Sequence, residues 1–139
     1  MTYGLTIVRI AIGIFFFFMG LGKLGWFTDS SVLVKTLSSW LEMAGPLNRW
    51  YLESIALPGA GVFARVVPLA ELATGAGLIL GAWTRVVAVL AFLMVLNFHF
   101  ASGALFRYAF LTNAFGLPVL GPLAGLACGA VRLPLSLRK

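Results

Sequence analysis

The sequence is conspicuously short of charged side chains. Only 10% of its 139 residues are charged and only four are acidic, whereas 61% are hydrophobic. The mean hydropathy is +1.03. A soluble domain of this length needs far more polar surface to cover its core. The composition therefore excludes a soluble globular protein and indicates an integral membrane protein.

Cysteine and histidine are almost absent as well. The single cysteine, Cys128, cannot form a disulfide within the chain, and no CxxC pair is present for thiol exchange or zinc binding. The single histidine, His99, cannot supply both ligands of a bis-histidine haem and argues against a metal site. The sequence also lacks a nucleophile elbow, a Walker loop and a dinucleotide fingerprint. These absences favour a chain without catalytic activity of its own.

Basic residues outnumber acidic ones, ten to four, for a formal charge of +6. They are scattered singly, and most stand near the ends of apolar runs, where lysine and arginine meet headgroups. Membrane topology therefore explains the charge, and nucleic acid is not an expected partner. The tail carries Arg132, Arg138 and Lys139, whereas no basic residue precedes Arg9. This asymmetry favours cytoplasmic termini.

Long apolar runs dominate the remaining sequence. Four of them, at residues 5–26, 62–82, 84–103 and 109–131, are long enough to cross roughly 30 Å of hydrocarbon as helices. They lack the period-two alternation of a membrane β-barrel. Because most connections are short, the sequence predicts one all-α domain over residues 1–139. We expect an antiparallel four-helix membrane bundle whose first span is a retained anchor.

The only long connection is an amphipathic segment over residues 28–58. Val32, Leu33, Leu37 and Leu41 recur at helical spacing, and Pro58 ends the segment. Such a segment is typical of helices that lie in the headgroup plane and cap a bundle. The same surface could instead dock another membrane subunit, and the pattern does not separate these interpretations.

Glycines at helical spacing predict close helix packing. The set comprises Gly77, Gly81, Gly121, Gly125 and Gly129. Small residues four apart allow helix backbones to approach one another. Packing inside the bundle is favoured over a dedicated dimerisation face.

Glu71 lies near the middle of the second span, where an unpaired carboxylate costs a few kcal/mol or more. Arg9 lies on a small-residue stripe of the first span, at a depth that differs from that of Glu71 by roughly 10 Å. We therefore expect Glu71 to pair with Arg9, with Arg65 and Arg85 as alternative partners. The pair could serve only helix register, or it could be a ligand or proton site.

A second polar group is expected at one membrane end. Asn97 and His99 stand near the end of the third span, and Asn113 and Lys23 fall at the same level. Asn97, Asn113 and Lys23 could line one pocket. Asn97 and His99 are about 200° apart on an ideal helix, which predicts that they do not face one ligand. His99 could donate to a quinone carbonyl, bind a porphyrin metal or hydrogen-bond to a loop carbonyl.

Two stretches resemble the DoxX family of membrane proteins. Residues 8–24, VRIAIGIFFFFMGLGKL, match its arginine, its glycine-containing apolar span and its lysine. Residues 68–90, PLAELATGAGLILGAWTRVVAVL, match its mid-helix glutamate, glycine-rich run and Thr-Arg turn. The resemblance covers the first three spans. It implies a four-helix bundle of prokaryotic cytoplasmic membranes, in a family that includes a subunit of thiosulfate:quinone oxidoreductase. The charged positions at which this sequence matches the family's motifs are Arg9, Lys23, Glu71 and Arg85.

Three hypotheses about function follow. The favoured one is a non-catalytic accessory or scaffold subunit of a larger respiratory or photosynthetic redox complex, with quinone contact and other membrane subunits as partners. The second is a membrane subunit of a quinone-reducing oxidoreductase of the thiosulfate:quinone type. The third is a small-solute or proton conduit centred on Glu71. Quinone is the only cofactor that these hypotheses involve.

Overall fold

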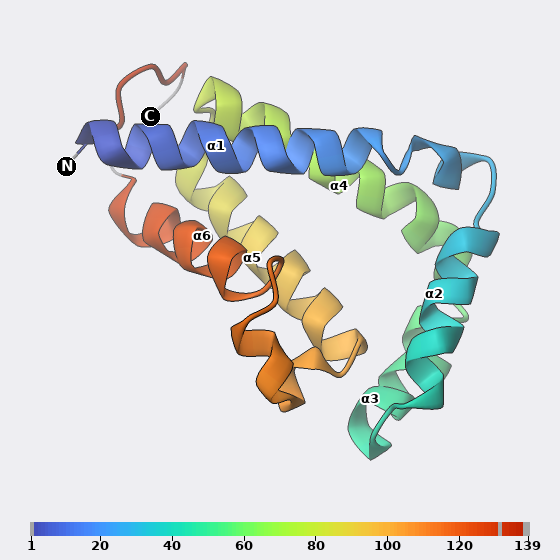
Figure 1. Cartoon of the computed structure of the whole chain (residues 1–139). Helices are drawn as coiled ribbons and strands as arrows, with labels where there is room; N and C mark the ends of the chain where they lie inside the picture. Colours follow the sequence, from blue (N-terminus) through green and yellow to red (C-terminus); the bar gives the residue numbers. More distant parts are fainter. Residues whose placement is uncertain (1, 131, 138–139) are drawn as a thin grey trace.

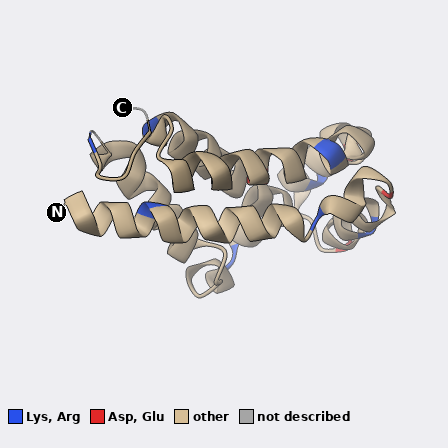
Figure 2. Cartoon of the chain, turned by 90° about the horizontal axis from the view of Figure 1, so that it is seen from above, with Lys and Arg blue, Asp and Glu red and all other residues tan. Residues whose placement is uncertain are grey.

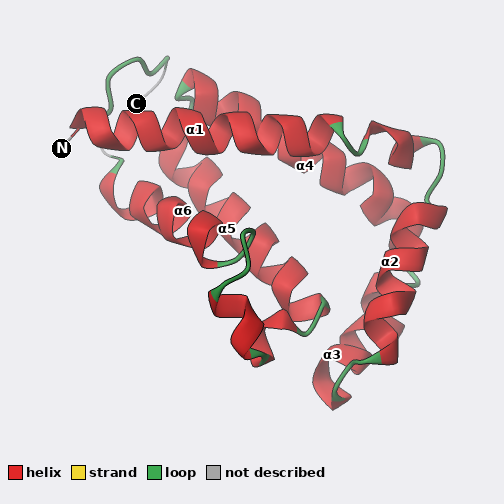
Figure 3. Ribbon diagram, in the orientation of Figure 1, coloured by secondary structure: helices red, strands yellow, loops and turns green. Residues whose placement is uncertain are grey.

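The computed structural model describes residues 2–130 and 132–137. Almost every described residue before the C-terminal tail belongs to a helix or a short turn (Figure 3). The α-helices are α1 (Thr2–Leu21), α2 (Ser31–Glu42), α3 (Pro46–Tyr51), α4 (Ala60–Leu80), α5 (Thr84–Ala101) and α6 (Leu117–Gly129). The short turns are η1 (Leu24–Phe27), the π-helical η2 (Leu52–Ala56), η3 (Ala104–Phe106) and η4 (Tyr108–Leu111). The predicted all-α class is confirmed.

Helices α1 and α4 form the closest pair and run side by side (Figure 1). Glycines make this contact close: a Cβ at Gly75 would lie 2.5 Å from the backbone nitrogen of Phe17. A Cβ at Gly13 would lie 2.9 Å from the backbone nitrogen of Ile79, and one at Gly20 the same distance from that of Leu72. The two backbones therefore touch along most of α1, in an antiparallel register that these glycines set.

Helices α5 and α6 pack together and diverge from α1 and α4 toward the far end of the molecule (Figure 1). Where the two pairs are still close, Leu78, Leu123 and Leu126 are fully buried against the small residues Ala88 and Ala91. Between the diverging ends, helices α2 and α3 close the open side (Figure 1). The fold is therefore tightly packed at one end and capped at the other.

Within the described residues, three helices are long and apolar enough to span a membrane: α1, α4 and α5. The predicted fourth span, residues 109–131, needs correction. Its first part is η4 and an irregular turn, and α6 has only 13 residues. At 1.5 Å per residue α6 reaches about 20 Å, short of the roughly 30 Å hydrocarbon core. The sequence stays apolar through this turn, but the helix begins only after its N-cap residue Gly116, with Pro118 in its first turn.

The segment 28–58 forms the helical cap that its amphipathic pattern predicts. Leu33 and Leu37 of α2 are buried with Leu52 and Ala56, in a second hydrophobic cluster that includes the beginning of α4. Asp29 begins this segment by accepting a hydrogen bond from the backbone nitrogen of Ser31 at 2.9 Å, and hydrogen bonding to Ser31 lowers the pKa of Asp29. The cap therefore has a core of its own.

Two of the three glycines predicted to form a packing face on the last helix, Gly121 and Gly125, have no packing neighbour among the described residues. A Cβ at Gly121 or Gly125 would meet no atom within 4 Å. A Cβ at Gly129 would lie 3.1 Å from Leu5, and one at Gly77 would lie 3.2 Å from Val87, so these two glycines do face neighbours. Gly81 ends α4 with φ +68. Helix α6 packs instead through another face, which leaves Gly121 and Gly125 on its exposed side; the buried residues of that face are Val119, Leu120, Leu123 and Leu126.

Labelling experiments can test the arrangement of the two ends. The cap and the connection between α5 and α6 share one end, because Arg107 donates to the Met43 carbonyl at 3.3 Å. In a Cys128→Ala background, we expect single cysteines at Ser38 and Tyr108 to react with an impermeant maleimide from one side of the membrane. A cysteine at Ser136 should react from the opposite side. Labelling of Ser38 and Tyr108 from opposite sides would refute this topology.

Candidate functional site

Glu71 forms an ion pair with Lys23. The ammonium nitrogen lies 2.6 Å from Oε1 and 2.7 Å from Oε2, so both carboxylate oxygens accept from one lysine. The Glu71 side chain is 4% exposed and that of Lys23 is 19% exposed. Lys23 also lies 5.7 Å from the ring centroid of Trp26, a distance at which an ammonium is attracted to an aromatic face.

The expected partner of Glu71 was wrong. Arg9 lies further along the antiparallel pair, and donates instead to the hydroxyl of Ser136 and, at 2.7 Å, to the carbonyl of Leu135. The register explains the difference. Gly20 lies against Leu72, which brings the end of α1 to the level of Glu71, whereas Arg9 lies against Gly81.

The two alternative partners also bind elsewhere. Arg65 is exposed and donates to the Gly61 carbonyl at 2.7 Å, so Pro68 does not bend α4 enough to bring Arg65 to Glu71. Arg85 donates through Nε to the Ala127 carbonyl at 2.9 Å. It therefore joins the beginning of α5 to the end of α6.

The ion pair lies in the wall of a cavity of about 400 Å³. This size falls within the range of small-molecule sites. The cavity occupies the region where the two helix pairs diverge; α2 and η2 line part of it, and it remains partly open. Most of its lining is apolar: Phe15, Phe16, Met19, Trp26, Leu33, Leu37, Trp40, Ala56, Phe63, Val67, Val95, Phe98, Ala101, Phe115 and Val119. Its polar side chains are Lys23, Thr36, Tyr51, Glu71, Asn97 and His99.

Asn97 and His99 line the same cavity, although helical spacing predicted that they could not face one ligand. The cavity extends along two sides of α5, which explains the difference. On one side Tyr51 donates to Oδ1 of Asn97 at 2.7 Å. On the other side Nε2 of His99 lies 2.8 Å from the carbonyl of Phe115. Because a carbonyl only accepts, Nε2 of His99 carries the proton in this bond.

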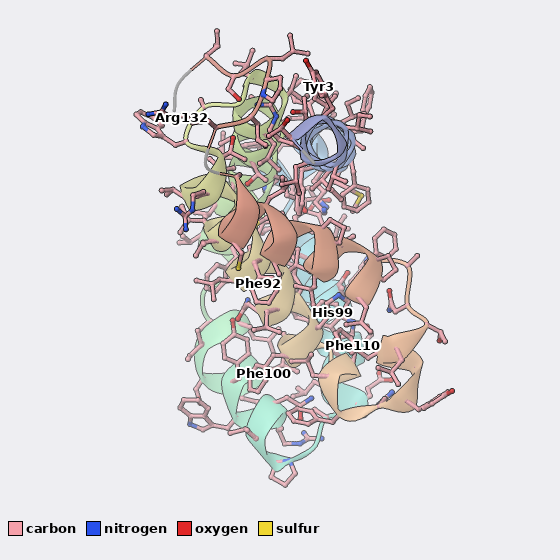
Figure 4. The ribbon with its side chains drawn as sticks, turned by 90° about the vertical axis from the view of Figure 1, so that its left-hand side faces the viewer. Tyr3, Phe92, His99, Phe100, Phe110 and Arg132 are labelled. Carbon is pink, nitrogen blue, oxygen red and sulfur yellow. The ribbon has the colours of Figure 1, made fainter. Side chains whose placement is uncertain are left out.

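His99 is also packed against an aromatic ring. Figure 4 shows it beside Phe110, with the ring centroids 5.1 Å apart and nearly perpendicular. The backbone bond and this contact fix the imidazole in the wall. Of the sequence hypotheses for His99, the hydrogen bond to a loop carbonyl is the one that the structure bears out.

Asn113 does not join the cavity. Its side-chain oxygen accepts from the backbone nitrogen of Phe115 at 2.8 Å, which stabilises the turn before α6. It lines a separate depression with Arg107 and Ser102. Tyr51, which the sequence placed only in the interfacial cap, does reach the cavity. Its aromatic ring on an amphipathic segment was the available signal.

Comparison with known protein families matches residues 4–104 to the DoxX family. The chain belongs to the DoxX family. The match begins in α1 and ends at the beginning of η3, so the DoxX region holds the ion pair, Tyr51, Asn97 and His99, and α6 lies beyond it. Its extent agrees with the resemblance of the first three spans. Comparisons with curated proteins and with solved structures find no match. Family membership and the three long apolar helices make this chain a multi-pass membrane protein.

Proposed function

We propose that this DoxX protein is a non-catalytic accessory subunit of a membrane redox complex, and that its cavity holds a quinone. The observation that carries this proposal is the combination of an apolar cavity of about 400 Å³ with the Lys23–Glu71 pair in its wall. A quinone has a flat apolar ring with carbonyl oxygens at its edge. It therefore needs apolar walls and a small number of hydrogen-bond donors.

Two donors remain for the carbonyl oxygens of such a ligand. The Lys23 ammonium has three protons, and its two bonds to Glu71 leave one. The Asn97 oxygen accepts from Tyr51, so its amide group keeps its own protons. Lys23 follows α1 and Asn97 lies on α5, so the donors approach the cavity from different helices. The Nε2 proton of His99 is already donated to the backbone carbonyl of Phe115, so His99 forms part of the cavity wall and is not counted among the free donors.

The residue content of this chain is suited to binding and positioning a ligand. One histidine and one cysteine offer too few ligands for a bis-histidine haem or a cysteine-bound cluster. Electron carriers would then belong to partner subunits. The cap offers a surface for such a partner, because Met43, Leu47 and Trp50 are each more than half exposed. We propose a prokaryotic cytoplasmic membrane as its location, with both termini in the cytoplasm, because the tail carries Arg132, Arg138 and Lys139 whereas no basic residue precedes Arg9.

Tryptophan fluorescence gives a direct test of quinone binding. Trp26 and Trp40 line the cavity, so a short-chain ubiquinone should quench the fluorescence of the protein in nanodiscs in a saturable way. Asn97→Leu removes one donor at similar volume and should weaken binding several-fold. Asn113→Leu is the matched control, because Asn113 lies outside the cavity, and it should leave binding unchanged.

The outcomes separate the hypotheses about function. Linear quenching without saturation, equal in both variants, would mean that quinone only partitions into lipid and would overturn the proposal. Purification in mild detergent tests the partner role, since we expect a subunit with flavin, haem or an iron–sulfur cluster to remain bound. Quinone reduction by the resulting complex would support the alternative of a quinone-reducing oxidoreductase. A proton flux without quinone binding, lost in Glu71→Gln, would instead support a conduit.

A further inference from the structure

Among residues 2–130 and 132–137, Arg9 is a buried cation without an anionic partner. It lies within α1, its residue is 0% exposed, and its guanidinium holds five donors in a planar fork. Two of its nitrogens bond to neutral groups, the Leu135 carbonyl and the Ser136 hydroxyl. The third, Nε, is buried and has no hydrogen-bond partner in the part of the chain that the structure describes. The side chain is therefore held in place, but neither its charge nor its donors are fully satisfied.

No acidic side chain lies at this end of the molecule. Glu71 is paired with Lys23, and the other three acidic residues of the sequence, Asp29, Glu42 and Glu53, belong to the cap. Figure 2 shows the acidic positions of the cap far from the end where the tail and the beginning of α1 lie. Arg85, at the beginning of α5, and Arg132 (Figure 4) add further positive charge there. An uncompensated guanidinium in a membrane bundle is costly, and such groups are functional candidates.

The C-terminal tail covers Arg9 through a strained backbone. Leu135 has φ +55, a conformation that L-residues with side chains rarely adopt. The same strained residue directs its carbonyl to Arg9 while its side chain is 79% exposed. Leu137 anchors the tail by donating to the Leu80 carbonyl at 2.9 Å. The tail thus presents two oxygens to the guanidinium of Arg9, while its Leu135 and Leu137 side chains stay exposed.

Gly81 completes the site. A Cβ at this position would collide with Nη1 of Arg9 and would lie 2.6 Å from the Ser136 hydroxyl. The absence of a side chain at the end of α4 therefore leaves the space that the guanidinium and its oxygen partners occupy. Arginine forks of this kind match the oxygens of a phosphate group.

We propose that Arg9 is a binding site for a phosphate group, and that Leu135 and Ser136 of the tail compete for the same donors. The phosphate oxygens accept from the guanidinium, including the unpartnered Nε, and supply the missing negative charge. Arg9 lies seven residues after the beginning of α1, or about 10 Å along the helix, within reach of the headgroup layer. The phosphate can therefore come from an anionic lipid headgroup or from free phosphate in the aqueous phase.

Thermal unfolding in a neutral detergent tests the proposal. Added phosphatidylglycerol should raise the Tm of the parent protein by several degrees, and native mass spectrometry should detect one retained lipid. Phosphatidylcholine is the control for lipid without net charge. In parallel, sodium phosphate is compared with sodium chloride at equal ionic strength. A response to the lipid alone identifies a headgroup as the source, and a response to phosphate alone identifies the free ion. No response to either overturns the proposal.

Two pairs of variants assign the response to Arg9. Arg9→Gln should lose it, whereas Arg107→Gln, an equal change of charge at the other end, should keep it. Ser136→Asp places a carboxylate beside Arg9, and it should raise the Tm without added anion and abolish the anion response. Ser38→Asp, on the exposed face of α2, should keep the response. If Arg9→Gln does not fold, the comparison of Ser136→Asp with Ser38→Asp still tests whether the anion binds at Arg9. An anion response in Ser136→Asp equal to that of the parent would refute the site.

Discussion

Glu71→Gln is expected to destabilise the folded chain by about 3–5 kcal/mol, the usual cost of breaking a buried ion pair from one side. The substitution leaves the Lys23 ammonium at the wall of an apolar cavity with only a neutral amide as partner. Lys23 is 19% exposed and could turn partly toward solvent or headgroups, which places the expected loss nearer the lower figure.

Unfolding in detergent, followed by circular dichroism, measures this loss. Lys23→Met combined with Glu71→Gln should recover much of the stability, because neither charge is then left alone. Glu53→Gln is the matched control: it breaks a 3.5 Å pair with Arg49 whose side chains are 53% and 44% exposed. We expect it to change stability by less than about 0.5 kcal/mol. If Glu71→Gln unfolds like the parent and only quinone binding is lost, the carboxylate serves the ligand and is not needed for the fold.

The sequence predicted that Glu71 needs a partner, but it assigned the wrong one. Depth along each span is uncertain by several residues when helix ends are estimated from hydropathy, and Arg9 and Lys23 both belong to the predicted first span, residues 5–26. What distinguishes them is the register of α1 against α4, which depends on contacts such as Gly13 with Ile79. Such contacts between distant parts of the chain cannot be obtained from the periodicity of one helix alone.

Hydropathy predicted α1, α4 and α5 to within a few residues and failed at α6. Residues 108–116 are mostly apolar, yet in the structure they form η4 and a turn. Gly116 followed by Pro118 is a helix-start signal, and giving it more weight would have shortened the last span. The contact of the tail with Arg9 carries no such signal. Pro134, Leu135 and Ser136 show no helical periodicity, and Arg9, the partner of Leu135 and Ser136, lies more than a hundred positions away.

The candidate site was predictable in part. Lys23, Asn97 and His99 were grouped at one membrane end, and all three line the cavity. The aromatic ring of Tyr51 on an amphipathic segment is a weak signal, because one such segment does not show which side chains reach past the cap into the cavity. Asn113 was included because its polarity and depth fit, but its oxygen serves a local turn. Polarity and depth therefore select candidates, and only the fold separates a ligand-facing amide from a turn-forming one.

Gly75→Leu is expected to cost about 3 kcal/mol or more, or to prevent folding. A Cβ at Gly75 would lie 2.5 Å from the nitrogen and 2.6 Å from the Cα of Phe17. Those are backbone atoms, so no rotamer change can relieve the overlap, and α1 would have to move away from α4. That movement would also separate Lys23 from Glu71 and widen the cavity. The expected loss therefore includes both the helix contact and the ion pair.

Gly125→Leu is the matched control, and it distinguishes packing within this chain from packing against another. A Cβ at Gly125 meets nothing within 4 Å, so in the isolated chain this substitution should change stability by less than about 0.5 kcal/mol. Both variants are measured by thermal unfolding, beside their apparent mass in detergent. If Gly125→Leu is as costly as Gly75→Leu and lowers the apparent mass, the α6 glycines contact a second protein chain. If Gly75→Leu unfolds like the parent, α1 and α4 do not approach as closely as their glycines indicate, and the register that pairs Glu71 with Lys23 is wrong.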